Sequence, residues 1–257
     1  ASHAAHIKGP RFDFGSYRYD KYRSLVRWDE GERPASHPLA IARPRPDIEG
    51  MRDLNRLKRS AAAMALFAAA LWILLGYGVL LPFDLVQSLG IYPRETTTLS
   101  GILTAPLMHS SVGHLAANTV PLFVLGTAML YSLPRAATLA LPAIWLLSGL
   151  GVWLFGRPSF HIGISGVTHG MLFFMLLIGV LRRDRASVAL TMIVTFLYGS
   201  MIWGVLPQGP HISFESHLFG ALAGLAAAAA LRNADPLTSR RLFEPAAVPA
   251  SEADDPV

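Results

Sequence analysis

HIGISGVTHGMLFFMLLIGVL, residues 161–181, joins a short polar motif to a long apolar run. A helix needs roughly 20 mostly apolar residues to cross a hydrocarbon core about 30 Å thick. The run over 164–181 approaches that length and contains no charged residue. This stretch therefore predicts a membrane-spanning helix that carries Ser165 in its first turn.

Five other segments have a similar length and composition. Together with the first, the six expected spans cover residues 61–81, 115–133, 136–155, 164–181, 186–206 and 216–231. Apolar runs of this length also form buried helices in soluble proteins, but six in succession favour membrane spans. We therefore expect an all-α membrane protein built as a bundle of six transmembrane helices.

The overall composition agrees with a membrane protein. Hydrophobic residues make up 52% of the 257 residues and charged residues only 15%, whereas soluble domains carry about 25% charged residues. The chain contains no cysteine. This excludes disulfides, a thiol nucleophile and cysteine-ligated metal sites.

The net charge of +5 belongs to the first 59 residues, which hold 13 Lys and Arg and 8 Asp and Glu. We expect a basic cytoplasmic tail at 1–59, of which 1–50 is a candidate extension upstream of Met51, and a core at 60–231. A disordered cytoplasmic tail, rich in Pro, Ala and acidic residues, is expected at 232–257. Aromatic and basic residues alternate over 11–28; this favours contact with a lipid surface over binding of nucleic acid.

The basic residues also predict an orientation, because basic loops near span ends remain in the cytoplasm. With the N-terminus inside, 20 Lys and Arg lie on the inner side and only Arg94 and Arg157 on the outer side. Both termini are then cytoplasmic. The second, fourth and sixth spans begin at the outer surface, so their first turns share one depth.

The histidines beyond the tail gather at that depth. All six lie in outer loops or in the first turns of the even-numbered spans: His109, His114, His161, His169, His211 and His217. Polar groups within a bilayer are costly and tend to mark function. Ser165, between Gly163 and Gly166, has an accessible hydroxyl beside backbone N–H groups that a helix start leaves unused. The same small residues would also suit simple helix packing.

His217 is the candidate base for that serine. Gly220 and Gly224 form a small-residue face beside it on the sixth span. If that face meets the fourth span, His217 comes within hydrogen-bonding distance of Ser165, as general-base activation requires. The alternative is a structural histidine bonded to a loop carbonyl.

His114 and Asn118 lie four residues apart on one face of the second span. Both can donate hydrogen bonds to a developing oxyanion, although Asn118 could instead tie neighbouring helices together. The outer acidic residues occupy no evident triad position. A Ser-His dyad is therefore the simpler assignment.

The strings HSSVGHLAANT (109–119), GISG (163–166) and SHLFGALAG (216–224) together resemble the rhomboid family of intramembrane serine proteases. The resemblance covers 60–231 and implies a six-helix rhomboid bundle that cuts transmembrane protein substrates without metal or cofactor. It implies Ser165 as nucleophile, His217 as base, and His114 and Asn118 as oxyanion donors. It also favours a bacterial plasma membrane, with the active site toward the outer side.

Two positions depart from the family pattern. His169 stands where many members carry a tyrosine that stacks on the catalytic histidine, and the Trp-Arg pair of the first outer loop is absent from 82–108. His109 matches a further histidine of many members. The segment 206–214 is expected to cap the site, either as a movable element or as a static turn.

Two other functions remain open from the sequence. A non-catalytic rhomboid-like protein would hold membrane clients without cutting them. A haem or metal protein would use the same histidines as ligands.

Overall fold

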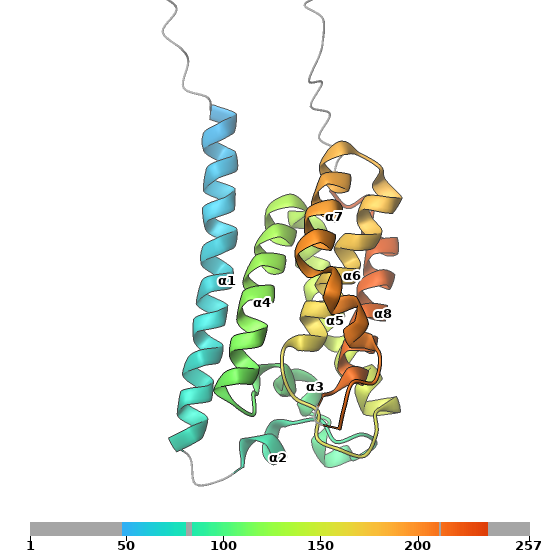
Figure 1. Ribbon diagram of the computed structural model, residues 1–257. Coiled ribbons are helices and arrows are strands. Elements are labelled where there is room, and N and C mark those ends of the chain that lie inside the picture. Colours follow the sequence, from blue (N-terminus) through green and yellow to red (C-terminus); the bar gives the residue numbers. More distant parts are fainter. Residues whose placement is uncertain (1–47, 81–83, 211, 236–257) are drawn as a thin grey trace, which may run out of the picture. The chain divides into compact units, whose positions relative to one another are not determined.

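Six long helices form the bundle (Figure 1). A computed structural model describes residues 48–80, 84–210 and 212–235. The long helices are α1 (Ile48–Leu80), α4 (Val112–Ser132), α5 (Pro134–Phe155), α6 (Ser165–Arg182), α7 (Arg185–Tyr198), which the 3₁₀ helix η3 (Gly199–Val205) extends, and α8 (Phe214–Leu231). All six are long and apolar enough to cross a membrane. The described residues contain no strand beyond one isolated bridge. The predicted all-α, six-span membrane fold is confirmed.

Helix α6 lies at the centre of the bundle. It packs against α8, α7, α4 and α5, while α1 packs against α4. The side chains of Leu172, Phe174 and Met175 on α6 are fully buried. The helix that begins with Ser165 is therefore held on several sides.

Glycines bring α6 and α8 into backbone contact. A Cβ atom added to Gly220 would meet the carbonyl of Gly166, and one added to Gly224 would meet the carbonyl of Gly170. Small residues allow this close approach between membrane helices. The expected contact between the two glycine faces is present, and it places the first turns of α6 and α8 side by side.

Helix α1 begins well before the apolar run that starts at residue 61. Arg56 donates to Asp53 over 3.1 Å, one turn earlier on the helix, and pairs at this spacing stabilise helices. The last part of the expected tail at 1–59 is thus helical. Residues 1–47 and 236–257 lie outside the described part of the chain, so the predictions made for those residues stay predictions.

The fifth span is not one continuous α-helix. Its α-helical part ends at Tyr198 and the tighter η3 helix completes it. Gly199 and Gly204 lower the preference for an α-helix there. An apolar run predicts a span but does not reveal this change of helix type.

A set of short helices covers the end of the bundle where α4, α6 and α8 begin (Figure 1). It comprises α2 (Leu85–Leu89), η1 (Thr96–Thr98), α3 (Gly101–Thr104) and η2 (Ala105–Leu107). Ile91 and His161 exchange backbone hydrogen bonds of 3.1 and 2.8 Å. The covering segment is therefore fixed to the loop that leads to Ser165.

Candidate active site

Ser165 is the first residue of α6, and the backbone just before it turns sharply. Gly163 has φ +102°, and a Cβ there would lie 2.9 Å from ring atoms of His114. Only glycine adopts this conformation readily and leaves room for the ring. The N–H groups of the first turn have no intrahelical acceptor, so they are available as hydrogen-bond donors at the residue that carries the hydroxyl.

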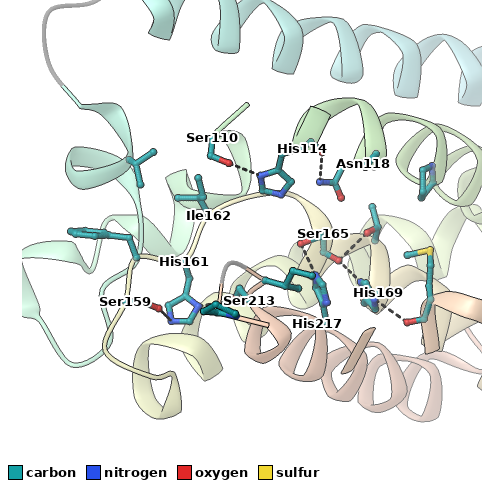
Figure 2. Close-up of a pocket in the computed structure, with 18 of the residues that line it drawn as sticks. Ser110, His114, Asn118, Ser159, His161, Ile162, Ser165, His169, Ser213 and His217 are labelled. Carbon is teal, nitrogen blue, oxygen red and sulfur yellow. Dashed lines mark hydrogen bonds between the residues drawn. The ribbon is translucent and has the colours of Figure 1, made fainter. Parts of the chain in front are cut away.

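His217 lies directly beside that hydroxyl (Figure 2). Its Nε2 is 2.9 Å from Ser165 Oγ. The two residues are 52 positions apart in the sequence and come from the first turns of α6 and α8. The distance of 2.9 Å between Oγ and Nε2 is short enough for a proton transfer from the hydroxyl to the ring.

A backbone carbonyl orients the His217 ring. Nδ1 lies 2.9 Å from the oxygen of Gly204, and a carbonyl oxygen can only accept. Nδ1 therefore carries the hydrogen and Nε2 keeps its lone pair toward Ser165. This is the tautomer that a general base needs, and it is set here without a carboxylate.

His169 supports the other face of His217. The two rings are stacked, with centroids 3.9 Å apart and planes at 7°. Nδ1 of His169 lies 2.8 Å from the backbone carbonyl oxygen of Ser165, and Nε2 lies 3.1 Å from the carbonyl oxygen of Met201. The ring thus links the start of α6 to η3, the same helix that supplies the Gly204 carbonyl.

His114 and Asn118 line the same cavity as Ser165 and His217. This cavity has a volume of about 710 Å³. Ser110 Oγ lies 3.2 Å from His114 Nδ1, and Asn118 Nδ2 donates to the His114 carbonyl over 3.0 Å. That bond uses one of the two amide hydrogens, so the other remains available to a bound oxyanion.

Two further histidines support the loop before Ser165. Nε2 of His109 accepts from the N–H of Ile164 over 3.4 Å. Burial, together with the neighbouring His114, lowers the pKa of His109 to about 4. Burial also lowers the pKa of His161. Both rings are therefore neutral near pH 7 and serve as uncharged hydrogen-bonding groups.

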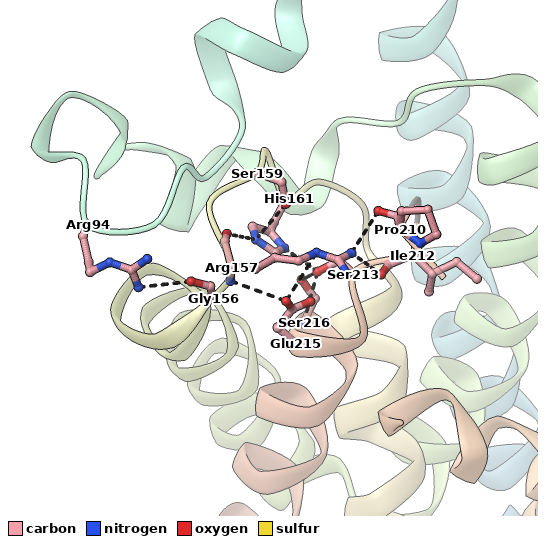
Figure 3. Close-up of polar contacts among 10 residues, drawn as sticks. All are labelled: Arg94, Gly156, Arg157, Ser159, His161, Pro210, Ile212, Ser213, Glu215 and Ser216. Carbon is pink, nitrogen blue, oxygen red and sulfur yellow. Dashed lines mark hydrogen bonds and ion pairs between the residues drawn. The ribbon is translucent and has the colours of Figure 1, made fainter. Parts of the chain in front are cut away.

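Arg157 joins that loop to the segment before α8 (Figure 3). Its Nη2 donates to the carbonyls of Pro210 and Ile212 over 3.1 and 2.6 Å, and its Nε lies 3.5 Å from Glu215 Oε1. The Glu215 side chain is buried. The guanidinium therefore fixes one end of the expected cap to the chain that leads to Ser165.

His161 makes a second link beside Arg157. Its Nε2 donates to the Arg157 carbonyl over 3.1 Å, and the Ser213 hydroxyl, 2.6 Å away, then donates to Nδ1. Ser213 also caps α8 by accepting from the N–H of Ser216. The start of the helix that carries His217 is thus held by two neighbouring contacts.

The structure brings Ser165, His217, His114 and Asn118 to one cavity. His211 lies outside the described residues. Within the described part of the chain, no three His, Asp or Glu side chains are grouped to hold a metal ion.

The sequence did not point to the Gly204 carbonyl, because a backbone acceptor leaves no side-chain signal. Arg157 could have been noticed as one of two basic residues in the outer loops.

Comparison with known proteins connects this geometry to a family. The family model described as Rhomboid domain matches residues 96–234. Proteins of Mycobacterium bovis and Mycobacterium tuberculosis, each named as uncharacterized, are 40% identical over 148 residues, which make up 54% of this chain and 62% of theirs. An uncharacterized protein of Mycobacterium leprae is 35% identical over 148 residues, 54% of this chain and 59% of its own. The match thus spans less than two thirds of these relatives.

Proposed function

The chain belongs to the rhomboid family, and on that premise we propose that it is a serine endopeptidase that hydrolyses peptide bonds in or beside transmembrane segments of membrane proteins. The observation that carries the proposal is the 2.9 Å contact between Ser165 Oγ and His217 Nε2. The Gly204 carbonyl supports it, because it leaves the His217 lone pair toward the hydroxyl.

The reaction would be an acyl transfer in two steps. Ser165 attacks the carbonyl carbon while His217 takes the hydroxyl proton, and the imidazolium then gives that proton to the leaving amine. Water, deprotonated by His217, releases the acyl group and restores the serine. General acid–base catalysis of this kind contributes about 10² to 10⁴ in rate.

His114, Asn118 and the backbone N–H of Ser165 would stabilise the oxyanion. One such donor is worth about 10² to 10³ in rate. A helical substrate must also unwind locally, because its carbonyls are engaged in backbone hydrogen bonds. We therefore propose substrates with small or helix-breaking residues near the cut.

The proposed location is a bacterial plasma membrane, with both termini in the cytoplasm and Ser165 toward the outer side. The distribution of Lys and Arg supports this orientation. The mycobacterial relatives support a bacterial membrane.

Labelling with a fluorophosphonate probe tests the proposal and separates an enzyme from a non-catalytic client-binding protein. We expect the full chain in detergent to become labelled at Ser165, and the Ser165→Ala and His217→Ala variants to remain unlabelled. Both variants should also fail to cleave a reporter with a single transmembrane helix. Cleavage by the Ser165→Ala variant at the unaltered rate would refute the assignment.

A further inference from the structure

A second cavity lies at the end of the bundle opposite to Ser165. It has a volume of about 530 Å³ and lies between α1, the end of α4 and the start of α5. In Figure 1 the start of α1, the end of α4 and the start of α5 lie at the end of the bundle away from the short helices that cover the Ser165 end. Arg52, Arg56 and Arg59 of α1 line this cavity.

The three arginines share one face of α1, because positions three and four apart lie above one another on a helix. Arg56 is fixed by Asp53 at 3.1 Å and by the Tyr131 ring, whose centroid is 5.0 Å from its Cζ. Within 48–80, 84–210 and 212–235, neither Arg52 nor Arg59 has an ion-pair or side-chain hydrogen-bond partner. Both are exposed. Two guanidinium groups thus remain available to an anion.

The rest of the lining is suited to a lipid rather than to a free anion. Ala63, Leu130 and Pro134 form apolar walls, and the Ser60 side chain is buried beside them. The arginines directly precede the apolar run of α1, which begins at residue 61. Along α1 the cavity is therefore lined first by charged groups and then by apolar ones. A phospholipid has the same arrangement, with a charged headgroup followed by acyl carbons.

We propose that this cavity binds one anionic phospholipid, with Arg52 and Arg59 on its phosphate and the acyl carbons along Ala63 and Leu130. Arginine binds phosphate oxygens through a planar pair of N–H donors. Basic pockets between transmembrane helices bind anionic headgroups. A general excess of basic residues sets orientation, but it does not require three of them on one helix face around a cavity. The site is independent of the proposed protease activity.

Native mass spectrometry of the full chain in detergent, with phosphatidylglycerol or phosphatidylcholine added, tests the site. We expect one retained phosphatidylglycerol and a preference over phosphatidylcholine. Each basic group near an anionic headgroup contributes about a fivefold gain in binding, so the Arg52→Gln/Arg59→Gln variant should bind roughly 30-fold more weakly. The single variants Arg52→Gln and Arg59→Gln should each bind about fivefold more weakly.

The matched control is Lys58→Gln/Arg185→Gln. It removes the same charge from the same end of the bundle, but neither residue lines the cavity. If this control variant retains phosphatidylglycerol as well as the unaltered chain does, the result supports the site. An equal loss of lipid in both double variants would show unspecific electrostatic attraction and overturn the proposal. Displacement of the lipid by excess inorganic phosphate would overturn the lipid assignment in favour of a free-anion site.

Discussion

Two imidazole rings, those of His169 and His217, lie face to face beside Ser165 and contact main-chain oxygens. The sequence predicted that His217 lies near Ser165, because glycines follow both residues in their helices and allow the two helices to pack closely. It could not place the Gly204 and Met201 carbonyls, since their positions depend on the 3₁₀ turns of η3. At the residue scale, the sequence therefore predicted which side chains form the site, but not which backbone carbonyls orient them.

His169 supplies a flat surface for His217, and its loss should slow the reaction of Ser165. Stacked aromatic pairs contribute about 0.5–1.5 kcal/mol, so we expect His169→Ala to lower the rate of fluorophosphonate labelling by roughly two- to thirteenfold. His169→Tyr restores a ring at this position and should retain most of the rate. Equal rates for the alanine variant and the unaltered chain would contradict the supporting role.

His109 should make stability depend on pH. Its pKa is about 4 in the folded chain, against 6.5 for a free histidine, so the unfolded chain binds more protons between these values. His109 should leave the free energy of unfolding unaffected well above pH 6.5 and should lower it as the pH falls through 6.5 toward 4. Thermal unfolding in detergent at a series of pH values measures this.

The matched variant for this pH effect is His109→Gln, which keeps a hydrogen-bond acceptor for the N–H of Ile164 but does not titrate in this range. It should lose stability less steeply below pH 6.5. Part of the decrease should remain, because burial lowers the pKa of His161 as well. Identical pH curves for the two proteins would exclude a contribution from His109.

At the scale of elements, the apolar runs predicted the six spans because length and composition suffice for that purpose. They did not predict that α1 begins at Ile48, since polar residues continue a helix when ion pairs along it are favourable. They also did not show that Arg157 holds the segment before α8, because this contact joins two loops distant in sequence.

Arg157 should restrict the motion of the chain around Ile212. The chain contains no cysteine, so a spin label introduced through Ile212→Cys reports on this segment alone. Electron paramagnetic resonance should show a restrained label, and Arg157→Gln should release it, because the bonds to the Pro210 and Ile212 carbonyls are lost.

Arg94 offers the control for this experiment. It also donates to carbonyls beside the same loop, those of Leu154 and Gly156, but has no bond to residues 210–215 among those the structure describes. Arg94→Gln should leave the label restrained. Release of the label by both substitutions would assign the effect to the loop as a whole and not to the Arg157 contacts.

For the whole molecule, the predicted orientation decides on which side of the membrane Ser165 and the two termini lie. Single cysteines introduced through Thr97→Cys and Ser132→Cys lie at exposed positions on opposite ends of the bundle. In intact cells, a membrane-impermeant maleimide should modify residue 97 at once and residue 132 only after permeabilisation. The reverse pattern would invert the proposed topology and place Ser165 toward the cytoplasm.

The Gly204 carbonyl has a consequence for how this protein tolerates change. Every residue type has a carbonyl, so no side-chain deletion in η3 can remove the acceptor that holds His217 Nδ1. A shift of the main chain can, and a methyl group at position 204 would crowd the rings of His169 and His217, at 2.6 and 3.3 Å. Insertions or deletions in η3, and any larger residue at position 204, should therefore be poorly tolerated. Substitutions of the neighbouring residues should be tolerated much better, whatever their chemical character.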